Sequence, residues 1–398
     1  AFANAPVCSA SRQSLLTGRY PHAAGVTLLQ TLFPEEQITV AEHLQQFGFR
    51  TGYVGKMHFN NDLKHGFDSR VQARDYRRHL EQQPLQPPEG VRTRPPWRPF
   101  QDHARVWLNA EGLPSPYYDK DDIGTWYSNR AIEFLEQNRH ERFCLWLGYH
   151  EPHSPFNFPI EYAGKYDPRD MPMPENSPED DRWIPRVFAD LTKEERRGII
   201  ASYYTSVEYL DKNIGLVLDA LDRLGLTEET LVIYIGDHGY LLNDHKRFEK
   251  HTMWEEAVGA PLIILGEGKV PRNVVRDQLC EFVDLAPTIT EALGVPPMAT
   301  AQGKSLLPAL QKSVAHKDYV FSEFLVDNLA MVRTKRWKYV FTTGQRDLGQ
   351  GYETGHGAPG MTHRLYDLAA DPHEHRNVAH LPEHRETLQH LQRVMIEH

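Results

Sequence analysis

Apolar segments rich in β-branched residues alternate along this chain with segments whose apolar residues recur at helical spacing. Residues 39–56 predict a helix followed by a strand, and residues 128–138 and 206–225 predict helices. Apolar runs at 143–150, 230–239 and 260–268 predict strands, and the last two predict strands buried on both faces. This alternation predicts an α/β fold, with a mostly parallel central sheet covered by helices on both faces.

The pattern changes from about residue 318 onward. Short strands separated by basic turns are predicted at 319–324, 329–343 and 364–368, and a closing helix at 384–398. We therefore expect a catalytic α/β domain over 1–317 and a smaller antiparallel subdomain over 318–398. Residues 69–125 and 156–192 lack periodicity and predict long surface insertions that shape a binding site.

Composition narrows the class of partner. The 398 residues carry a formal net charge of -10 and no basic arm, which argues against nucleic acid and against an anionic membrane surface. No apolar run is long enough to span a bilayer. Three cysteines without a C-x-x-C spacing indicate neither a disulfide scaffold nor a structural zinc site. A small-molecule or glycan partner fits this composition better. The sequence does not fix the cellular compartment, but we favour a periplasmic or secreted bacterial protein over a cytoplasmic one.

Cys8 precedes a segment that predicts a short helix, with Ser9 or Ser11 as N-cap and Thr17–Gly18 as the stop. A helix N-terminus stabilises an anion, and Arg12 adds a cation one turn along the same face. These charges favour a reactive residue, whereas a lone cysteine is more often a small buried hydrophobe. Both interpretations remain open at this point.

Four further groups of polar residues follow apolar runs or lie close to them. They are Lys56 with His58, His150 with His153, Asp237 with His238, and Lys250 with His251. In an open parallel sheet the site forms beyond the carboxyl ends of the strands, so we expect these groups to converge on Cys8. Cations that hold an anion, a carboxylate for Ca²⁺ or Mg²⁺ and proton-carrying imidazoles indicate attack on an anionic ester.

The sequence Cys8-Ser9-Ala10-Ser11-Arg12, followed by Leu16-Thr17-Gly18-Arg19, resembles the signature of type I sulfatases in the alkaline phosphatase superfamily. The other four groups follow in that family's order, and residues 364–379 resemble its closing hairpin. The resemblance implies that a formylglycine-generating enzyme oxidises Cys8 to formylglycine (3-oxoalanine). The geminal diol of this residue would then attack the sulfur atom.

The resemblance also implies a role for each of the other residues. Arg12 would steady residue 8, and Lys56 and Lys250 would bind sulfate oxygens. His153 would protonate the leaving alcohol, and His58 would take the proton from the remaining hydroxyl so that sulfate is released. Asp237, His238 and modified Cys8 would hold a divalent metal, Ca²⁺ or alternatively Mg²⁺ or Mn²⁺.

One departure from the family concerns the metal. The family carries two metal-binding aspartates ahead of the modified cysteine, whereas only seven residues precede Cys8 here. We therefore expect a fragment of a longer protein, or an ion held weakly, because Ca²⁺ takes about six to eight oxygen ligands. Asp62, Asp68 and Asp244 are the acidic residues that would complete the site by another route.

Two other functions remain as alternatives to sulfate monoester hydrolysis. One is a phosphonate monoester or phosphodiester hydrolase that uses the same formylglycine, and the other is an inactive fragment that binds an anionic glycan. The expected substrate is a small-molecule or carbohydrate sulfate ester of a bacterium. Trp97, Arg98, Trp107 and Trp126 lie where they could stack on a sugar or aryl ring, although loop aromatics more often pack locally.

Overall fold

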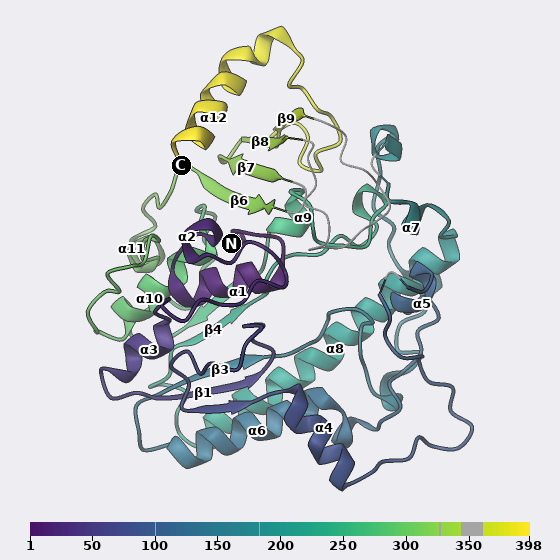
Figure 1. The fold of residues 1–398 in the computed structure, drawn as a ribbon, viewed down its shortest axis with the longest axis vertical. Helices are drawn as coiled ribbons and strands as arrows, with labels where there is room; N and C mark the ends of the chain where they lie inside the picture. The colour runs from purple at the N-terminus through teal and green to yellow at the C-terminus, as the bar shows by residue number, and fades with distance from the viewer. Residues whose placement is uncertain (100, 183, 326–327, 344–360) are drawn as a thin grey trace.

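The computed structural model describes residues 1–99, 101–182, 184–325, 328–343 and 361–398 (Figure 1). Positions 100 and 183, within the two expected insertions, and positions 326–327 and 344–360 of the C-terminal region lie outside the described residues. Strands β2 (Ser69–Val71), β1 (Arg50–Gly55) and β3 (Phe143–Gly148) form a parallel sheet in that order. Helices α6 (Ile123–Asn138) and α8 (Lys193–Arg223) cover one face, and α1 (Cys8–Thr17), α3 (Val40–Gln45) and α10 (Leu285–Ala292) lie on the other side (Figure 1). The predicted α/β fold with a parallel sheet is confirmed.

Strands β4 (Val232–Ile235) and β5 (Leu262–Leu265) differ from the prediction. They pair antiparallel with each other in a separate two-stranded sheet, so they do not join the described parallel sheet. Ile263 and Leu265 are 54% and 52% exposed, so β5 is not buried on both faces. The alternate residues Leu262 and Ile264 pack against the core with Phe282. A continuous apolar run predicts burial on both faces, but only one face is covered by the residues that the structure describes.

Helix α1 begins at Cys8, and its N-cap residue is Val7, which offers no side-chain hydrogen bond. The hydroxyl groups of Ser9 and Ser11 donate instead to carbonyl oxygens of other segments, so the N-cap prediction was wrong. The predicted stop is confirmed: Gly18 adopts a left-handed conformation with φ of 66°. Every residue of α1 is buried. The helix therefore holds Cys8 inside the protein rather than on its surface.

The C-terminal part forms the predicted smaller sheet. Its antiparallel strands are β6 (Val320–Phe324), β7 (Leu329–Arg333), β8 (Trp337–Thr342) and β9 (Thr362–Asp367), in sequence order. Helix α12 (Arg385–Glu397) packs against β7 and β8, where Leu391 joins Val332 and Tyr339 in one apolar cluster. Helices α9 (Glu255–Val258) and α11 (Leu307–Lys312) precede this sheet in the sequence.

The two expected insertions are more ordered than the sequence indicates. Residues 69–125 contain β2, α4 (Ala73–Gln82), α5 (Ala104–Trp107) and the start of α6. Residues 156–192 contain α7 (Arg186–Ala189) and short 3₁₀ turns, and Phe156 and Phe188 are fully buried in an apolar cluster. The second segment is therefore partly core. None of the helices within the described ranges combines the length and apolarity that a bilayer crossing requires.

Candidate active site

Cys8 lies at the first turn of α1 and is almost completely buried. Lys250 Nζ lies 3.1 Å from its Sγ, and Lys56 Nζ, just beyond β1, lies 3.4 Å from it. Burial of Cys8 opposes ionisation, but the two ammonium groups and His238 outweigh it, so the pKa of the thiol lies well below its ordinary value. The site therefore stabilises an anion at position 8.

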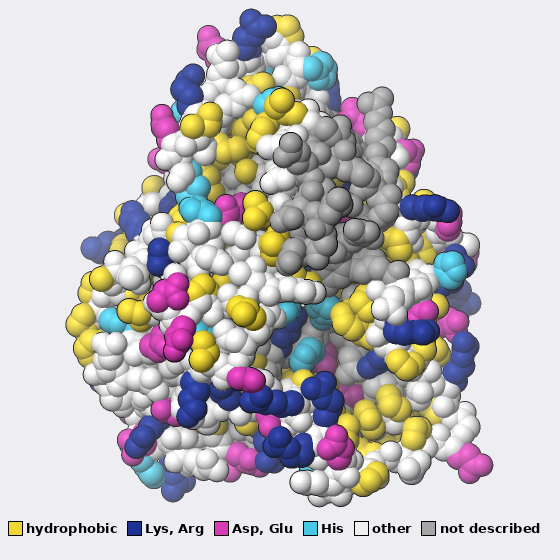
Figure 2. All heavy atoms as spheres, viewed as in Figure 1, with side chains coloured by type: hydrophobic (Ala, Val, Ile, Leu, Met, Phe, Trp, Pro, Cys, Tyr) yellow, Lys and Arg dark blue, Asp and Glu magenta, His cyan; other side chains and the backbone are white. Residues whose placement is uncertain are grey.

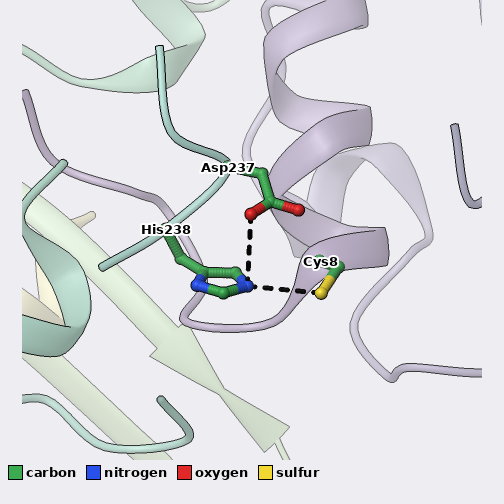
Figure 3. Close-up of side chains that lie close together, drawn as sticks. All are labelled: Cys8, Asp237 and His238. Atoms are coloured by element: carbon green, nitrogen blue, oxygen red, sulfur yellow. Dashed lines mark hydrogen bonds and ion pairs between the residues drawn. The ribbon is translucent and has the colours of Figure 1, made fainter. Parts of the chain in front are cut away.

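Asp237 and His238 follow β4 and point toward Cys8 (Figure 3). The His238 Nε2 atom lies 3.2 Å from Cys8 Sγ and 3.3 Å from Asp237 Oδ1. The Nδ1 atom of His238 lies 2.7 Å from the Gly239 carbonyl oxygen, which can only accept, so Nδ1 carries a proton. The Nε2 lone pair then faces a carboxylate oxygen and a sulfur atom. A cation bound among these three atoms would interact favourably with each of them.

Arg12 connects the segments that surround Cys8. Its Nε atom donates to Asp237 Oδ2 over 2.8 Å, and its Nη1 atom donates to the Lys56 carbonyl oxygen over 2.6 Å. Burial of the Asp237 carboxyl would raise its pKa, but His238 and Arg12 hold that pKa well below its usual range. Arg12 thus positions the Asp237 carboxylate and the Lys56 backbone, in addition to any direct effect on residue 8.

His153 interacts with the Cys8 side chain from the loop after β3. Its Nδ1 atom lies 2.8 Å from the Ser154 carbonyl oxygen, so this nitrogen carries the proton of a neutral ring. Burial and the charges of Lys250 and Lys56 lower the pKa of His153 to about 4. The ring is therefore neutral near pH 7, with its Nε2 atom available to accept a proton.

A pocket of about 910 Å³ opens above Cys8 and is lined by His58, His150 and His153 among others. Figure 2 shows a hollow with histidines inside it and a row of Lys and Arg side chains along one rim. The Nδ1 atom of His58 is buried and has no hydrogen-bond partner among the described residues. His58 thus lies in the same pocket, although its ring has no hydrogen bond to Cys8 within those residues.

The residues named from the sequence as a metal site do lie together. One ligand atom each from Cys8, Asp237 and His238 fall within 4.8 Å of one another. A single carboxylate, an imidazole and a sulfur atom are far from the six to eight oxygen atoms that Ca²⁺ takes. The described group could hold a divalent ion that accepts nitrogen and sulfur ligands. It could hold Ca²⁺ or Mg²⁺ only with further oxygen ligands. Asp62, Asp68 and Asp244 do not belong to this group.

The four side chains predicted to stack on a sugar or aryl ring differ in where the structure places them. Trp97 lines the pocket, and its ring meets the His153 ring edge-on with centroids 5.6 Å apart. Trp107 is buried in an apolar cluster, and Trp126 packs against Tyr76. Arg98 forms an exposed ion pair and does not line the pocket. Only Trp97 is therefore placed to contact a substrate.

Sequence reasoning missed several residues of the pocket. Arg70, Arg74 and Arg77 lie on β2 and α4, in a segment whose pattern predicted a loop. Glu151 and Asp122 are buried carboxylic acids that line the same pocket. The three-residue spacing of Arg74 and Arg77, which lie on the same helix, was the signal that could have found part of the first group.

Comparison with known proteins identifies relatives of this chain. The profile of the family described as Sulfatase matches residues 1–295, and that of N-sulphoglucosamine sulphohydrolase, C-terminal, matches residues 243–398. Human Arylsulfatase K is 26% identical over 415 residues, which covers 95% of this chain and 71% of that protein. The Ulvan-active sulfatase of Formosa agariphila is 27% identical over 402 residues, covering 96% of this chain and 70% of that protein.

Solved structures share the fold. A phosphonate monoester hydrolase from Silicibacter pomeroyi has a TM-score of 0.81 at 23% identity, covering 100% of this chain and 86% of that one. A protein in complex with its substrate D-glucosamine-2-N,6-O-disulfate has a TM-score of 0.76 at 20% identity, covering 100% and 88%. The family match spans most of the chain and contains the whole Cys8 group. The chain belongs to the sulfatase family, and it is an enzyme that hydrolyses sulfate esters.

Proposed function

We propose that residue 8 is the nucleophile of this sulfatase after a formylglycine-generating enzyme has converted Cys8 to formylglycine. The observation that carries the proposal is the set of cations around Sγ, with Lys250 at 3.1 Å and Lys56 at 3.4 Å. In this structure the Cys8 sulfur atom stands in for the oxygens of the hydrated aldehyde that the mature enzyme would carry. That hydrate supplies an oxygen nucleophile. Burial at the N-terminus of α1 keeps competing water away from it.

The neighbouring side chains have distinct roles in this proposal. Lys56 and Lys250 bind sulfate oxygens and stabilise the charge that gathers on them. His153 delivers a proton to the leaving alcohol. Because its pKa is lowered to about 4 without substrate, the negative charge of bound sulfate has to raise that pKa before the ring can act as an acid. His58, whose buried Nδ1 lacks a partner among the described residues, accepts the proton of the remaining hydroxyl.

We propose a divalent cation at Asp237, His238 and residue 8. The His238 Nε2 atom, directed at a carboxylate oxygen and Sγ, supports this assignment because a cation between the three atoms could bind to each of them. Once bound, the ion would polarise a sulfate oxygen. Of the ions expected from the sequence, Ca²⁺ takes six to eight oxygen ligands, whereas Mg²⁺ usually binds one or two carboxylates and keeps several water molecules, so Mg²⁺ needs fewer ligands from the protein than Ca²⁺ does.

The proposed substrate is a small organic or carbohydrate sulfate ester that carries a second negative charge. Arg70, Arg74, Arg77 and Arg94 line the pocket, in a protein whose formal net charge is -10. A local cluster of cations on an acidic protein attracts an anion and orients it. Trp97 offers an apolar surface for a sugar or aryl ring beside His153.

We further propose that residues 1–317 form the catalytic domain and that residues 318–398 form a C-terminal subdomain. The separate four-stranded sheet β6–β9 supports this division. The backbone of Glu323 in β6 donates to the Asn4 carbonyl oxygen, which attaches the subdomain directly to the segment that precedes Cys8. The subdomain would thereby support α1.

The nucleophile is tested with protein made alongside a formylglycine-generating enzyme. Peptide mass analysis should find an aldehyde or its hydrate at position 8, and Cys8→Ala should abolish sulfate release without changing the circular dichroism spectrum. Cys8→Ser should also be inactive, because an alcohol cannot form the geminal diol. Turnover of an aryl sulfate should exceed that of the matching aryl phosphonate; the reverse would favour the phosphonate hydrolase alternative.

The second charge on the substrate is tested on helix α4. Arg77 lines the pocket, whereas the adjacent Arg78 does not and pairs with Asp75. Arg77→Ala should raise KM for a disulfated sugar at least about 10-fold while leaving KM for a neutral aryl sulfate nearly unchanged. Arg78→Ala is the matched control and should change neither. Equal effects of both variants on both substrates would contradict the proposed substrate class.

A further inference from the structure

A second group of metal-ligating side chains lies outside the Cys8 group. One ligand atom each from Asp180, His245 and His375 fall within 4.8 Å of one another. They come from three segments far apart in the sequence: the 3₁₀ turn η4 (Pro178–Arg182), the turn η5 (Asp244–Lys246), and the loop after β9. The fold therefore joins an insertion, the loop between Asp237 and Lys250, and the C-terminal subdomain at one point.

Two of the three ligands are held in place before any ion binds. The His245 side chain is 2% exposed, and its ring stacks on Trp254 with centroids 4.2 Å apart and an angle of 15°. Its Nδ1 atom lies 2.8 Å from Asp180 Oδ1, and Asp180 Oδ2 accepts from the Ser177 backbone N–H over 2.7 Å. Such outer contacts orient metal ligands in known metal sites. The pair is thus preorganised to present one nitrogen and one oxygen atom.

The third ligand arrives from the C-terminal subdomain. The His375 ring meets the His245 ring edge-on with centroids 5.6 Å apart, and the His375 backbone N–H donates to Asp371 over 3.0 Å. Ligand atoms about 2.0 to 2.2 Å from a tetrahedral ion lie roughly 3.3 Å from one another. The His245 Nδ1 to Asp180 Oδ1 distance is 2.8 Å, and no pair of the three ligand atoms is more than 4.8 Å apart, so binding an ion needs changes of about 1.5 Å or less in these distances. A rotation of the half-buried His375 side chain provides that adjustment.

The charges around the group favour a cation. Glu256 lies close enough to interact electrostatically with both His245 and Asp244. Its Oε2 atom is buried and has no hydrogen-bond partner within the described residues. Its Oε1 atom lies 4.0 Å from the ring of His373. Glu256 thus adds a second carboxylate near the two imidazoles and Asp180, and a divalent ion bound there would be stabilised by it.

We propose that Asp180, His245 and His375 bind a borderline-soft divalent transition metal of the Zn²⁺ class. Two imidazoles and one carboxylate suit Zn²⁺, whereas Ca²⁺ and Mg²⁺ prefer oxygen ligands. On binding, the proton shared by His245 Nδ1 and Asp180 passes to solvent, and both atoms turn their lone pairs to the ion. The ion would link the three segments and stabilise the loop that carries Lys250. This site is independent of the proposed nucleophile.

Zinc binding to the full chain, after chelator treatment, tests the site. Bound Zn²⁺ is counted by elemental analysis and by calorimetric titration in the wild type, Asp180→Asn, His375→Ala and His373→Ala. His373 is the matched control, because its side chain is 70% exposed and lies two residues from His375. We expect His375→Ala and Asp180→Asn to lose one equivalent, or at least about 100-fold in affinity, while His373→Ala binds as the wild type does.

Two further readouts separate a metal site from a hydrogen-bonded pair that serves structure alone. The Co²⁺-loaded wild type and His373→Ala should share visible d–d absorption from an ion bound by two imidazoles and a carboxylate, and His375→Ala should lack this contribution even when Co²⁺ is bound beside Cys8. Added Zn²⁺ should raise the Tm of the wild type and of His373→Ala by more than that of His375→Ala. Equal Zn²⁺ content in His375→Ala and His373→Ala, with no loss of the Co²⁺ spectrum, would overturn the assignment.

Discussion

We predict that the Glu151 carboxyl lowers the free energy of unfolding as the pH rises. Glu151→Gln should remove this contribution to the pH dependence. The side chain is buried in the floor of the pocket. The Asn157 amide donates to its Oε1 atom over 3.2 Å and to Asp122 over 2.8 Å, and Oε2 has no partner among the described residues. Burial and the neighbouring Asp122 raise the pKa of Glu151 from 4.5 to about 7.

The magnitude follows from the two pKa values. Below about pH 4.5 the carboxyl is protonated in both the folded and unfolded states; between there and about pH 7 only the unfolded state ionises. A raised pKa in the folded state therefore contributes stability at low pH that is lost as the pH rises. Because each pKa unit corresponds to about 1.4 kcal/mol, the wild type loses about 3 kcal/mol through this group by about pH 8.

Urea unfolding at a series of pH values measures this loss. The free energy of unfolding of Glu151→Gln minus that of the wild type should increase by about 3 kcal/mol between about pH 4.5 and pH 8, because glutamine stays neutral throughout. Glu141→Gln, at an exposed position, is the control and should give a flat difference. A flat difference for Glu151→Gln as well would refute the reasoning that burial holds this carboxyl protonated.

Two other substitutions test the charges of the buried interior. Lys250→Met should lower kcat for an aryl sulfate by about 100-fold or more, because it removes the ammonium nearest residue 8, whereas exposed Lys335→Met should leave kcat unchanged. Comparable activity of the two variants would argue against anion binding by Lys250. Lys338→Met should lower the free energy of unfolding by about 3 to 5 kcal/mol, because it leaves the buried carboxylate of Glu374 without its partner at 2.8 Å. Arg336→Met, in an exposed ion pair, should cost less than about 1 kcal/mol, and a similar cost for both would contradict the argument.

Local patterns in the sequence predicted every named strand except β2, and the helices α1, α3, α6, α8 and α12, because the period of such a pattern depends on neighbours in the chain. They predicted β1, β3 and the C-terminal strands, and they predicted the end of α1 at Gly18 because a left-handed stop favours glycine. They could not predict which strands pair. The apolar runs of β4 and β5 indicated parallel partners, yet the two strands pair antiparallel with each other.

The same limit applies to the sites. The Cys8 group was predicted because its members follow strand ends and match a family motif, so their order along the chain carried the signal. Arg77 and the other arginines of the pocket depend on how α4 packs against α6, which no local pattern specifies. His245 and His375 meet only through the attachment of the C-terminal subdomain. Their separation in the sequence matches no known metal-binding spacing, so their proximity could be recognised only from the structure.

The central claim is that an aldehyde at position 8 performs the reaction. Its most direct measurement compares, across preparations with different degrees of maturation, the fraction of chains with formylglycine at position 8 and the rate of sulfate release per chain. The account predicts a straight line through the origin, because each unconverted Cys8 chain contributes no turnover. Sulfate release that persists when the formylglycine fraction falls to zero would contradict it.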